Sequence, residues 1–270
     1  MQACLNQDTL RTTPTETFLK IARRTGFEAV ELTMDKVEPI MAKDALDELK
    51  NEIDAEKLTV ASINGPENFN LLADSEFQSI LTRTRRLASA AQEIGCKLLI
   101  PVPSPTKIGL SKDAIVSQTA EALAKLAEGC GDEISLGLEF LGMRNCSINS
   151  LETAVQAIRR AERPNVGLVI DAFHMHASAS PFSEITETID KTFLIHVNDS
   201  EPGDLEELTD ANRLFPGEGV IELRRFGQVL SESGYDGYVS LELLRPAYWQ
   251  QDPEQIARRG RESLKRVFGI

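Results

Sequence analysis

Four ionisable residues stand in or beside apolar runs, where an unpaired charge is costly to bury. They are Glu139 in LGLEF, Asp171 in GLVID, His196 in FLIHVND and Glu242 in VSLELL. Each run has the character of a buried strand, so an ionised side chain there needs a partner or a counter-charge. Three carboxylates and one imidazole at neighbouring strand ends predict a site for one divalent metal ion, either manganese, zinc, cobalt or magnesium.

The three histidines of the chain all lie near these runs. His174 and His176 follow Asp171 in the stretch DAFHMH. Imidazole titrates near neutral pH, so a histidine beside a metal site can donate to a substrate oxygen or carry a proton. We expect His174 to contact the substrate, and His176 is a second candidate.

Four more polar residues follow predicted strands and are candidates for substrate binding. They are Asn6, Asn64, Arg213 and Arg245. An arginine at such a place can bind a hydroxyl, an enediolate or a carboxylate. The alternative role for Arg213 is a surface ion pair, and for the other three residues it is a cap or a surface pair.

Apolar strand-like runs alternate with helical patterns along the whole chain. Strands are expected near 3–6, 29–32, 58–64, 97–102, 134–140, 166–171, 193–198 and 238–244. Helices are expected near 14–25, 42–56, 75–94, 112–129, 150–161, 181–190, 221–232 and 253–267. Eight strand–helix units predict an α/β fold, a single (β/α)8 TIM barrel over residues 1–270, whose functional residues gather at the carboxyl ends of the strands.

An open, doubly wound sheet is the alternative fold. It would usually carry a glycine-rich phosphate turn after the first strand. The segment CLNQDTLRTT has neither GxGxxG nor GxxxxGK[ST]. The barrel is therefore favoured.

Local signals mark the ends of several expected helices. Thr13 is a candidate N-cap with Pro14 at the first helical position. Ser111 is a candidate N-cap of the helix near 112–129. Asn149 or Ser150 fills the same role for the helix near 150–161, and Gly95 ends the helix near 75–94.

Composition excludes several classes of partner. The net charge is −13, from 42 acidic and 29 basic residues, which disfavours nucleic acid and anionic membranes as partners. We expect a cytoplasmic protein, since no apolar run is long enough to span a bilayer and the N-terminus does not read as a secretory signal. The four cysteines are far apart and are expected to be reduced. An oligomer is compatible with these features.

Several segments resemble the xylose-isomerase-like barrel superfamily of sugar isomerases and epimerases. They are LEFLGMRNCSIN, NVGLVIDAFHMHASAS, LTDANRLFPGEGVIEL, VSLELLRPAYW and the opening CLNQDTL. They are spread over about half of the chain and include Glu139, Asp171 and Glu242, whereas His196 lies between two of them. Within the superfamily, they are most similar to the inosose (2-keto-myo-inositol) isomerases of inositol catabolism.

The resemblance implies roles for individual residues. The four candidate ligands match the metal ligands of the superfamily, and Glu139 and Glu242 also match the glutamates that flank the reacting carbon. His174 matches a histidine that contacts substrate oxygen, and Arg213 matches an arginine that helps to stabilise the enediolate. Ketose 3-epimerases usually carry another glutamate where this chain has Asn145, so that activity is disfavoured.

The expected function is a metal-dependent isomerase of a small polyol ketone. It would interconvert 2-keto-myo-inositol and 1-keto-chiro-inositol by proton transfer through a metal-stabilised enediolate. We expect Glu139 and Glu242 to share the transfer at carbon, while His174 assists proton movement between oxygens.

Other functions can use the same fold. One is another sugar or sugar-phosphate isomerase or epimerase, and a second is 3-dehydroshikimate dehydratase, whose carboxylate substrate needs an arginine such as Arg213 or Arg245. A non-catalytic sugar-sensing barrel is a third. The abasic-site endonucleases of the superfamily are disfavoured by only three histidines and a net charge of −13.

Overall fold

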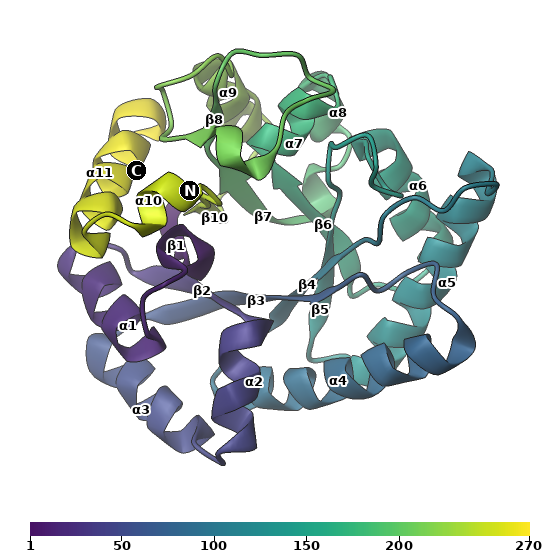
Figure 1. Cartoon of the computed structure of the whole chain (residues 1–270), viewed down its shortest axis with the longest axis horizontal. Helices are drawn as coiled ribbons and strands as arrows, with labels where there is room; N and C mark the ends of the chain where they lie inside the picture. Colours follow the sequence, from purple (N-terminus) through teal and green to yellow (C-terminus); the bar gives the residue numbers. More distant parts are fainter.

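Eight parallel strands close into a barrel in the computed structural model, which covers residues 1–270 (Figure 1). In chain order they are β1 (Gln2–Asn6), β2 (Ala29–Thr33), β3 (Thr59–Glu67), β4 (Leu98–Val102), β5 (Ser135–Glu139), β6 (Val166–Asp171), β7 (Thr192–Val197) and β10 (Tyr238–Leu241). The first strand pairs in parallel with the last, so both ends of the chain are needed to close the sheet. The predicted (β/α)8 barrel is confirmed.

Helices surround this barrel, and the short helix that follows β10 lies inside their ring in Figure 1. They are α1 (Thr15–Arg24), α2 (Met34–Ala42), α3 (Leu46–Glu56), α4 (Asp74–Glu93), α5 (Lys112–Cys130), α6 (Leu151–Ala161), α7 (Ala172–Ala177), α8 (Ser183–Thr186), α9 (Leu223–Glu232), α10 (Pro246–Trp249) and α11 (Pro253–Phe268). None of these helices combines the length and apolar character that a membrane span requires.

Short elements occupy some of the connections. The 3-10 helices are η1 (Gln7–Leu10), η2 (Ile189–Lys191) and η3 (Asp210–Asn212). Strands β8 (Asp199–Ser200) and β9 (Arg213–Leu214) form a separate antiparallel ribbon in the connection between β7 and α9.

Two expected helices differ from the prediction. The segment 42–56 is divided between α2 and α3, and the break contains Asp44, whose φ of 57° cannot continue a helix. The segment 181–190 contains only the short α8 and part of η2. Local apolar spacing indicated helix in both places but could not show these interruptions.

The predicted caps are mostly confirmed. Ser111 Oγ accepts a hydrogen bond from Ala114 N at 3.2 Å, and Ser150 caps α6 in the same way. Gly95 follows α4 with a φ of 78°. The prediction for α1 was wrong by one residue, because Thr13 N is bonded to Leu10 O in the preceding turn and the helix begins after Pro14.

Side chains fill the barrel interior in layers. Residues two apart on a strand point to the same face, so Asp171 lies one layer above Val169 on β6, and His196 one layer above Leu194 on β7. Val169 and Leu194 pack with Leu98 in a small apolar cluster. This apolar layer lies beneath the polar residues at the carboxyl end of the barrel.

A larger apolar core lies between the barrel and its helices. In α5, the side chains of Ile115, Val116, Leu123 and Leu126 are buried in it. They fall on one face of the helix, which is what anchors an amphipathic helix to a sheet. Burying one such side chain contributes about 1.5–3 kcal/mol.

Leu123→Ala should therefore lower the free energy of unfolding by about 2–5 kcal/mol, since Leu123 is fully buried and its removal leaves a cavity. Gln118→Ala, at an exposed position of the same helix, should change it by less than about 0.5 kcal/mol. Urea denaturation followed by circular dichroism measures both. Equal effects of the two substitutions would contradict the packing of α5.

Candidate metal centre

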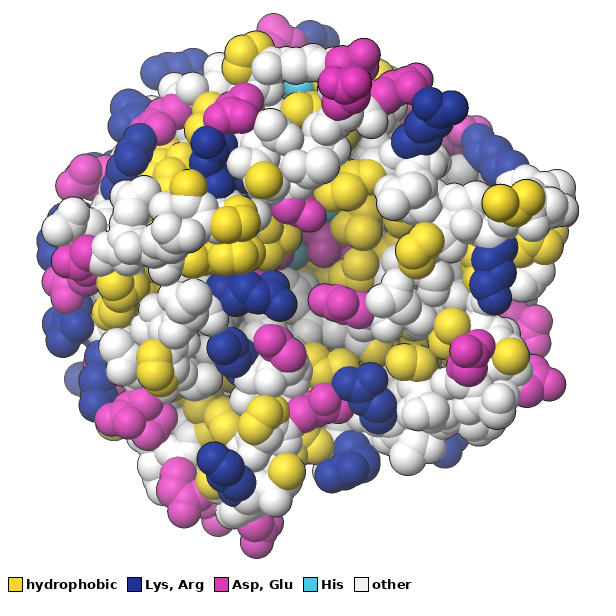
Figure 2. Space-filling model, viewed as in Figure 1, with side chains coloured by type: hydrophobic (Ala, Val, Ile, Leu, Met, Phe, Trp, Pro, Cys, Tyr) yellow, Lys and Arg dark blue, Asp and Glu magenta, His cyan; other side chains and the backbone are white.

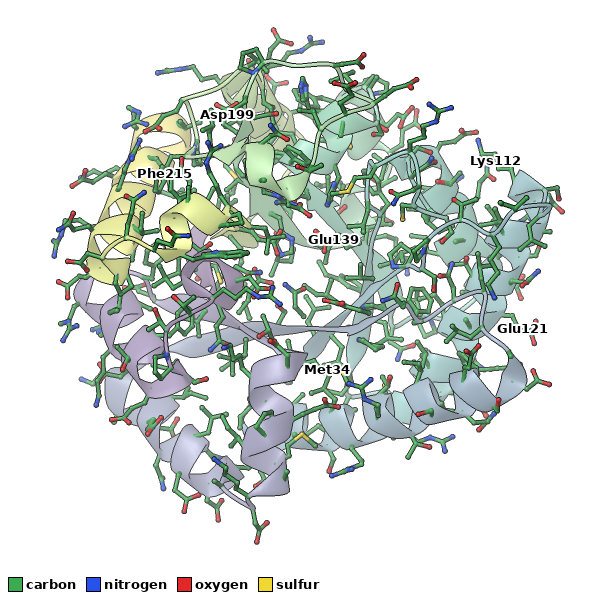
Figure 3. All side chains as sticks on the ribbon, viewed as in Figure 1. Met34, Lys112, Glu121, Glu139, Asp199 and Phe215 are labelled. Carbon is green, nitrogen blue, oxygen red and sulfur yellow. The ribbon has the colours of Figure 1, made fainter.

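The four predicted metal ligands lie together at the carboxyl end of the barrel. They come from neighbouring strands, with Glu139 at the end of β5, Asp171 at the end of β6, His196 in β7 and Glu242 directly after β10. Each offers one ligand atom, and the four atoms all lie within 4.8 Å of one another. All four side chains are buried. Figure 3 shows Glu139 at the centre of the barrel mouth, whereas Lys112 lies at the periphery.

Basic groups connect these carboxylates. His196 Nδ1 lies 2.7 Å from Glu139 Oε1 and 3.4 Å from Glu242 Oε2. Arg213 Nη1 donates to Asp171 Oδ2 at 2.6 Å and to Glu242 Oε2 at 3.1 Å. The ligand side chains therefore converge on one small volume.

The spacing and the donor set both fit one divalent cation. Two ligands of a zinc ion, each at about 2.0–2.2 Å, lie at most about 4.4 Å apart. Ligand atoms within 4.8 Å of one another need only small adjustments to meet that limit. Three carboxylate oxygens and one imidazole nitrogen suit zinc, manganese, cobalt or magnesium better than a metal that prefers sulfur.

Burial and mutual proximity perturb the acid–base equilibria of the centre. Burial raises the pKa of Glu242 well above its usual value; His196 opposes this rise and Glu139 adds to it. Burial acts to lower the pKa of His196, but the surrounding carboxylates, Glu242 foremost, outweigh it and raise that pKa. For Asp171, burial is outweighed by the Arg213 guanidinium, which holds the pKa below its usual range. Such an excess of buried carboxylates favours a bound cation.

Glu31, which the sequence reasoning missed, lies directly behind His196. Its buried carboxylate in β2 lies 3.0 Å from His196 Nε2. It also accepts hydrogen bonds from Asn6, Ser62 and Ser240. Because Glu31 binds the Nε2 side of the ring, Nδ1 faces the other three ligands, as in many metal sites where a carboxylate orients a histidine.

A sequence signal for Glu31 was present. It is the single charged residue of the apolar run AVEL. The burial argument that selected the four ligands applies equally to it.

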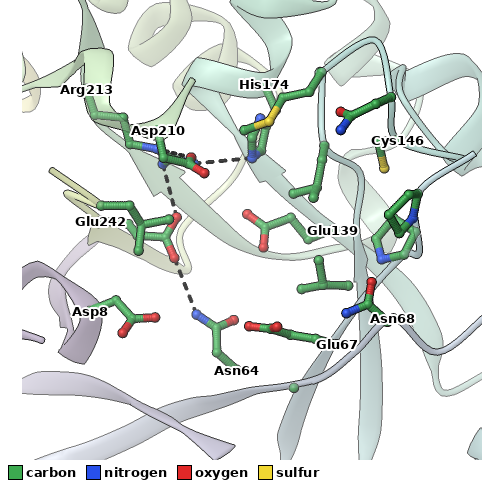
Figure 4. Close-up of a pocket in the computed structure, with 18 of the residues that line it drawn as sticks. Asp8, Asn64, Glu67, Asn68, Glu139, Cys146, His174, Asp210, Arg213 and Glu242 are labelled. Atoms are coloured by element: carbon green, nitrogen blue, oxygen red, sulfur yellow. Dashed lines mark hydrogen bonds and ion pairs between the residues drawn. The ribbon is translucent and has the colours of Figure 1, made fainter. Parts of the chain in front are cut away.

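His174 and Arg213 lie beside the centre (Figure 4). Arg213 Nη2 is 3.2 Å from His174 Nε2, and because a guanidinium only donates, Nε2 must be the acceptor. Burial lowers the pKa of His174, so the ring is neutral and its proton is on Nδ1, which is buried without a partner. Asp210, also missed from the sequence, pairs with Arg213 at 2.8 Å.

A buried aspartate fixes the loop that carries Arg213. Asp199, labelled in Figure 3, accepts hydrogen bonds from the backbone N–H groups of Ser200, Gly217 and Ile221, each at 2.9 Å. Ser200 is in turn paired with Arg213 in the β8–β9 ribbon. The guanidinium thus projects into the site from a rigid segment.

A pocket of about 420 Å³ opens over the centre. Figure 2 shows a hollow at the barrel mouth with acidic side chains at its base. Two of the candidate ligands, Glu139 and Glu242, line the pocket, together with His174 and Arg213. The other two candidate ligands, Asp171 and His196, do not line it. Its size suits a small molecule.

The remaining predicted substrate residues lie in different places. Asn64 lines the pocket, and its Oδ1 is buried without a partner. Asn6 does not line it, because β1 directs this side chain into the barrel, where its amide donates to Glu242 at 3.1 Å. The Arg245 guanidinium forms an ion pair with Glu201, and neither residue lines the pocket. His176 lines a separate hollow, since residues two apart on a helix face different directions.

Zinc or manganese should stabilise the folded protein, because the unfolded chain has no assembled centre to bind it. The expected gain is about 2.7 kcal/mol at a free metal concentration one hundred times the Kd. Differential scanning calorimetry with and without a chelator measures it. Asp171→Asn should remove the gain, and His176→Gln, outside the centre, should keep it. The same gain in Asp171→Asn would contradict the assignment of ligands.

Glu31→Gln should weaken metal affinity by about 10- to 100-fold, the usual effect of losing the carboxylate that orients a ligating histidine. Competition with a chromophoric chelator gives the affinity. Glu28→Gln, at an exposed position just before β2, is the matched control and should bind metal normally. Unchanged affinity in Glu31→Gln would mean that Glu31 does not orient His196.

Known proteins of nearly the same length are similar to this chain. The inosose isomerase of Halalkalibacterium halodurans is 30% identical, over 99% of this chain and 96% of its own. The inosose isomerase of Bacillus subtilis is 29% identical, over 97% and 96%. The crystal structure of the IolI protein with a zinc atom matches with a TM-score of 0.95 and 27% identity, covering 100% of this chain and 98% of that one.

A family profile covers nearly the same extent. The profile described as xylose isomerase-like TIM barrel matches residues 19–267. The match includes the whole metal centre and the loop that carries Arg213. The chain therefore belongs to the xylose isomerase-like TIM barrel family and is an enzyme.

Proposed function

We propose that this chain is a divalent-metal-dependent isomerase that interconverts 2-keto-myo-inositol and 1-keto-chiro-inositol. The observation that carries the proposal is the position of Glu139 and Glu242, which both line the pocket and both belong to the metal centre. The similarity to inosose isomerases over almost the whole chain supports the choice of substrate.

The reaction moves a carbonyl group to the neighbouring carbon. A C–H bond beside the ketone breaks, a new C–H bond forms at the former carbonyl carbon, and one proton passes between the two oxygens. A bound divalent cation supplies a Lewis acid that stabilises the negative charge developing on those oxygens. Glu139, Asp171, His196 and Glu242 would hold that cation.

The two glutamates carry the transfer at carbon. One carboxylate takes the proton as general base, and the second group returns a proton to the adjacent carbon. Both are enclosed at the base of the pocket, which excludes bulk water from the reacting carbons. The face of the sugar ring that meets each glutamate decides which one is the base.

His174 and Arg213 act on the oxygens. The free Nδ1–H of His174 is a donor that can deliver and recover a proton. Arg213 is fixed by its carboxylate partners and presents positive charge beside Glu242. Together they complement the charge that forms between the two oxygens.

A dehydratase acting on 3-dehydroshikimate is the second candidate. Its substrate carries a carboxylate, which needs a free arginine. Arg213 is fully buried and paired with Asp171, while Arg245 pairs with Glu201 outside the pocket. Neither arginine is free, which favours an uncharged substrate. Asn145 also lines the pocket, at the position where ketose 3-epimerases usually carry a glutamate, which disfavours that activity.

We further propose a cytoplasmic enzyme whose partner is this small polyol ketone, without nucleic-acid or membrane partners. The net charge of −13 supports this, because it repels phosphate backbones and anionic lipids.

Proton NMR of 2-keto-myo-inositol in deuterium oxide, with manganese-loaded protein, tests the function. The expected result is conversion to 1-keto-chiro-inositol with deuterium incorporated at the exchanging carbon. Absence of both in the metal-loaded protein would overturn the proposal, and loss of water from 3-dehydroshikimate would favour the dehydratase.

Glu139→Gln and Glu242→Gln should each lower kcat by about 10²- to 10⁴-fold, because an amide cannot take a proton from carbon. Metal content is measured by elemental analysis, so that only metal-replete protein is compared. Glu121→Gln, at the periphery in Figure 3, is the control and should retain full activity. A fully active, metal-replete Glu139 or Glu242 variant would remove that residue from the transfer.

A further inference from the structure

The pocket has two chemically different sides. His174 and Arg213 stand on one side of Glu139 and Glu242, and Asp8, Asn64 and Glu67 stand on the other (Figure 4). Asp8 comes from η1, whereas Asn64 and Glu67 belong to β3. We call Asp8, Asn64 and Glu67 the acceptor wall, because each carries an oxygen that accepts hydrogen bonds.

Several oxygens of the acceptor wall accept no hydrogen bond from the protein. Asp8 Oδ1 accepts from Arg11 Nη1 at 3.1 Å, which leaves Oδ2 free. Asn64 Oδ1 is buried and unpaired. Burial raises the pKa of Asp8 to about 6, so the carboxyl is mainly ionised at neutral pH. Buried polar atoms are nearly always hydrogen-bonded, so Asn64 Oδ1 lacks a partner that a ligand can supply. With Asp8 Oδ2 and the exposed Glu67 carboxylate beside it, the wall suits a ligand with several hydroxyl donors.

Outside the metal centre, each cationic side chain that lines the pocket already pairs with a carboxylate. Five carboxylates and two guanidinium groups line it: Asp8, Glu67, Glu139, Asp210, Glu242, Arg11 and Arg213. Arg11 pairs with Asp8 at 3.1 Å, and Arg213 pairs with carboxylates of the metal centre and with Asp210. Even with a divalent ion bound, the carboxylates outnumber the positive charges. A phosphate or carboxylate would meet repulsion here.

We infer that the acceptor wall is a specificity subsite, which binds hydroxyls of an uncharged polyol and rejects substrates that carry a carboxylate or a phosphate. The inference rests on the proposed function for the identity of the reacting ketone. Hydroxyls on carbons away from the ketone donate to Asp8, Asn64 and Glu67. These bonds set which carbons of the ring face Glu139 and Glu242.

Asn6 connects the acceptor wall to the metal centre. Its Oδ1 accepts from the backbone N–H of Asp8 at 2.8 Å, while its amide donates to Glu242 at 3.1 Å. On the other side, Trp249 Nε1 donates to the Asp8 carbonyl at 2.8 Å. Asp8 is thereby held in a fixed place relative to Glu242, as a subsite that orients a substrate requires.

Asp8→Asn tests this role, with Asp35→Asn as the matched control. Asp35 is exposed on α2 and does not line the substrate pocket, although it borders an adjoining hollow with Asp8. Its substitution removes a nearby charge and keeps all three acceptor-wall side chains. The probes are 2-keto-myo-inositol as substrate, and myo-inositol and 3-dehydroshikimate as an uncharged and an anionic ligand. Trp249, the single tryptophan of the chain, lines the pocket and reports binding by its fluorescence.

In metal-loaded Asp8→Asn, KM for 2-keto-myo-inositol should rise by about 10- to 100-fold, the usual effect of losing a charged acceptor, while kcat changes by less than about fivefold. Affinity for 3-dehydroshikimate should rise at least about tenfold, because Arg11 loses its counter-charge. The double variant Asp8→Asn with Arg11→Gln should lose this gain. Asp35→Asn should behave as the unsubstituted protein.

Two results would overturn the inference. One is an Asp8→Asn protein with the same KM and the same anion affinity as Asp35→Asn. The other is an unsubstituted protein that binds 3-dehydroshikimate as tightly as myo-inositol.

Failure of the proposed function gives a different pattern. Binding of myo-inositol that depends on Asp8, without any turnover of 2-keto-myo-inositol, would reject the isomerase and keep the subsite. Turnover that does not depend on Asp8 would keep the isomerase and reject the subsite.

Discussion

The structure depends on a concentration of negative charge at one end of a closed barrel. Glu31, Glu139, Asp171 and Glu242 are buried within reach of one imidazole, His196. Carboxylates in such surroundings are stable only with positive charge among them, since desolvation opposes ionisation. His196 and Arg213 supply part of that charge, and the arrangement of the ligand atoms suits a divalent ion for the rest. The uncompensated negative charge that the fold buries therefore favours the binding of a metal cation.

The surrounding elements keep that charge in place. Beneath it, Leu98, Val169 and Leu194 close the barrel interior with apolar contacts, so the polar groups face only the mouth. Beside it, Asp199 ties the loop of Arg213 to the barrel through three backbone hydrogen bonds. A site held on strand ends and on a braced loop has little freedom to relax, and this is what precise placement of reacting groups demands.

Sequence reasoning selected the four candidate ligands, which the fold brings together, because each is an isolated charge in an apolar run and the ends of parallel strands meet in a barrel. The same signal was present for Glu31 but was not used. Asp8 gave no such signal, because it lies in a polar turn. That turn is placed over the pocket only when β1 pairs with β10 and the barrel closes. The predictions for Asn6 and Arg245 depended on side-chain direction, which strand order alone does not determine.

The metal centre and the substrate pocket determine different aspects of activity, the class of reaction and the choice of substrate. A centre of this kind can assist proton removal beside many ketones, so it specifies a class of reaction and leaves the substrate open. The choice of substrate falls to residues such as Asp8 and Arg11, which come from the connection after β1 and pair with each other. The pairing with Asp8 neutralises Arg11, the basic side chain on the acceptor-wall side of the pocket. A change at a single position there could therefore alter which ketone is bound while the ligands stay the same.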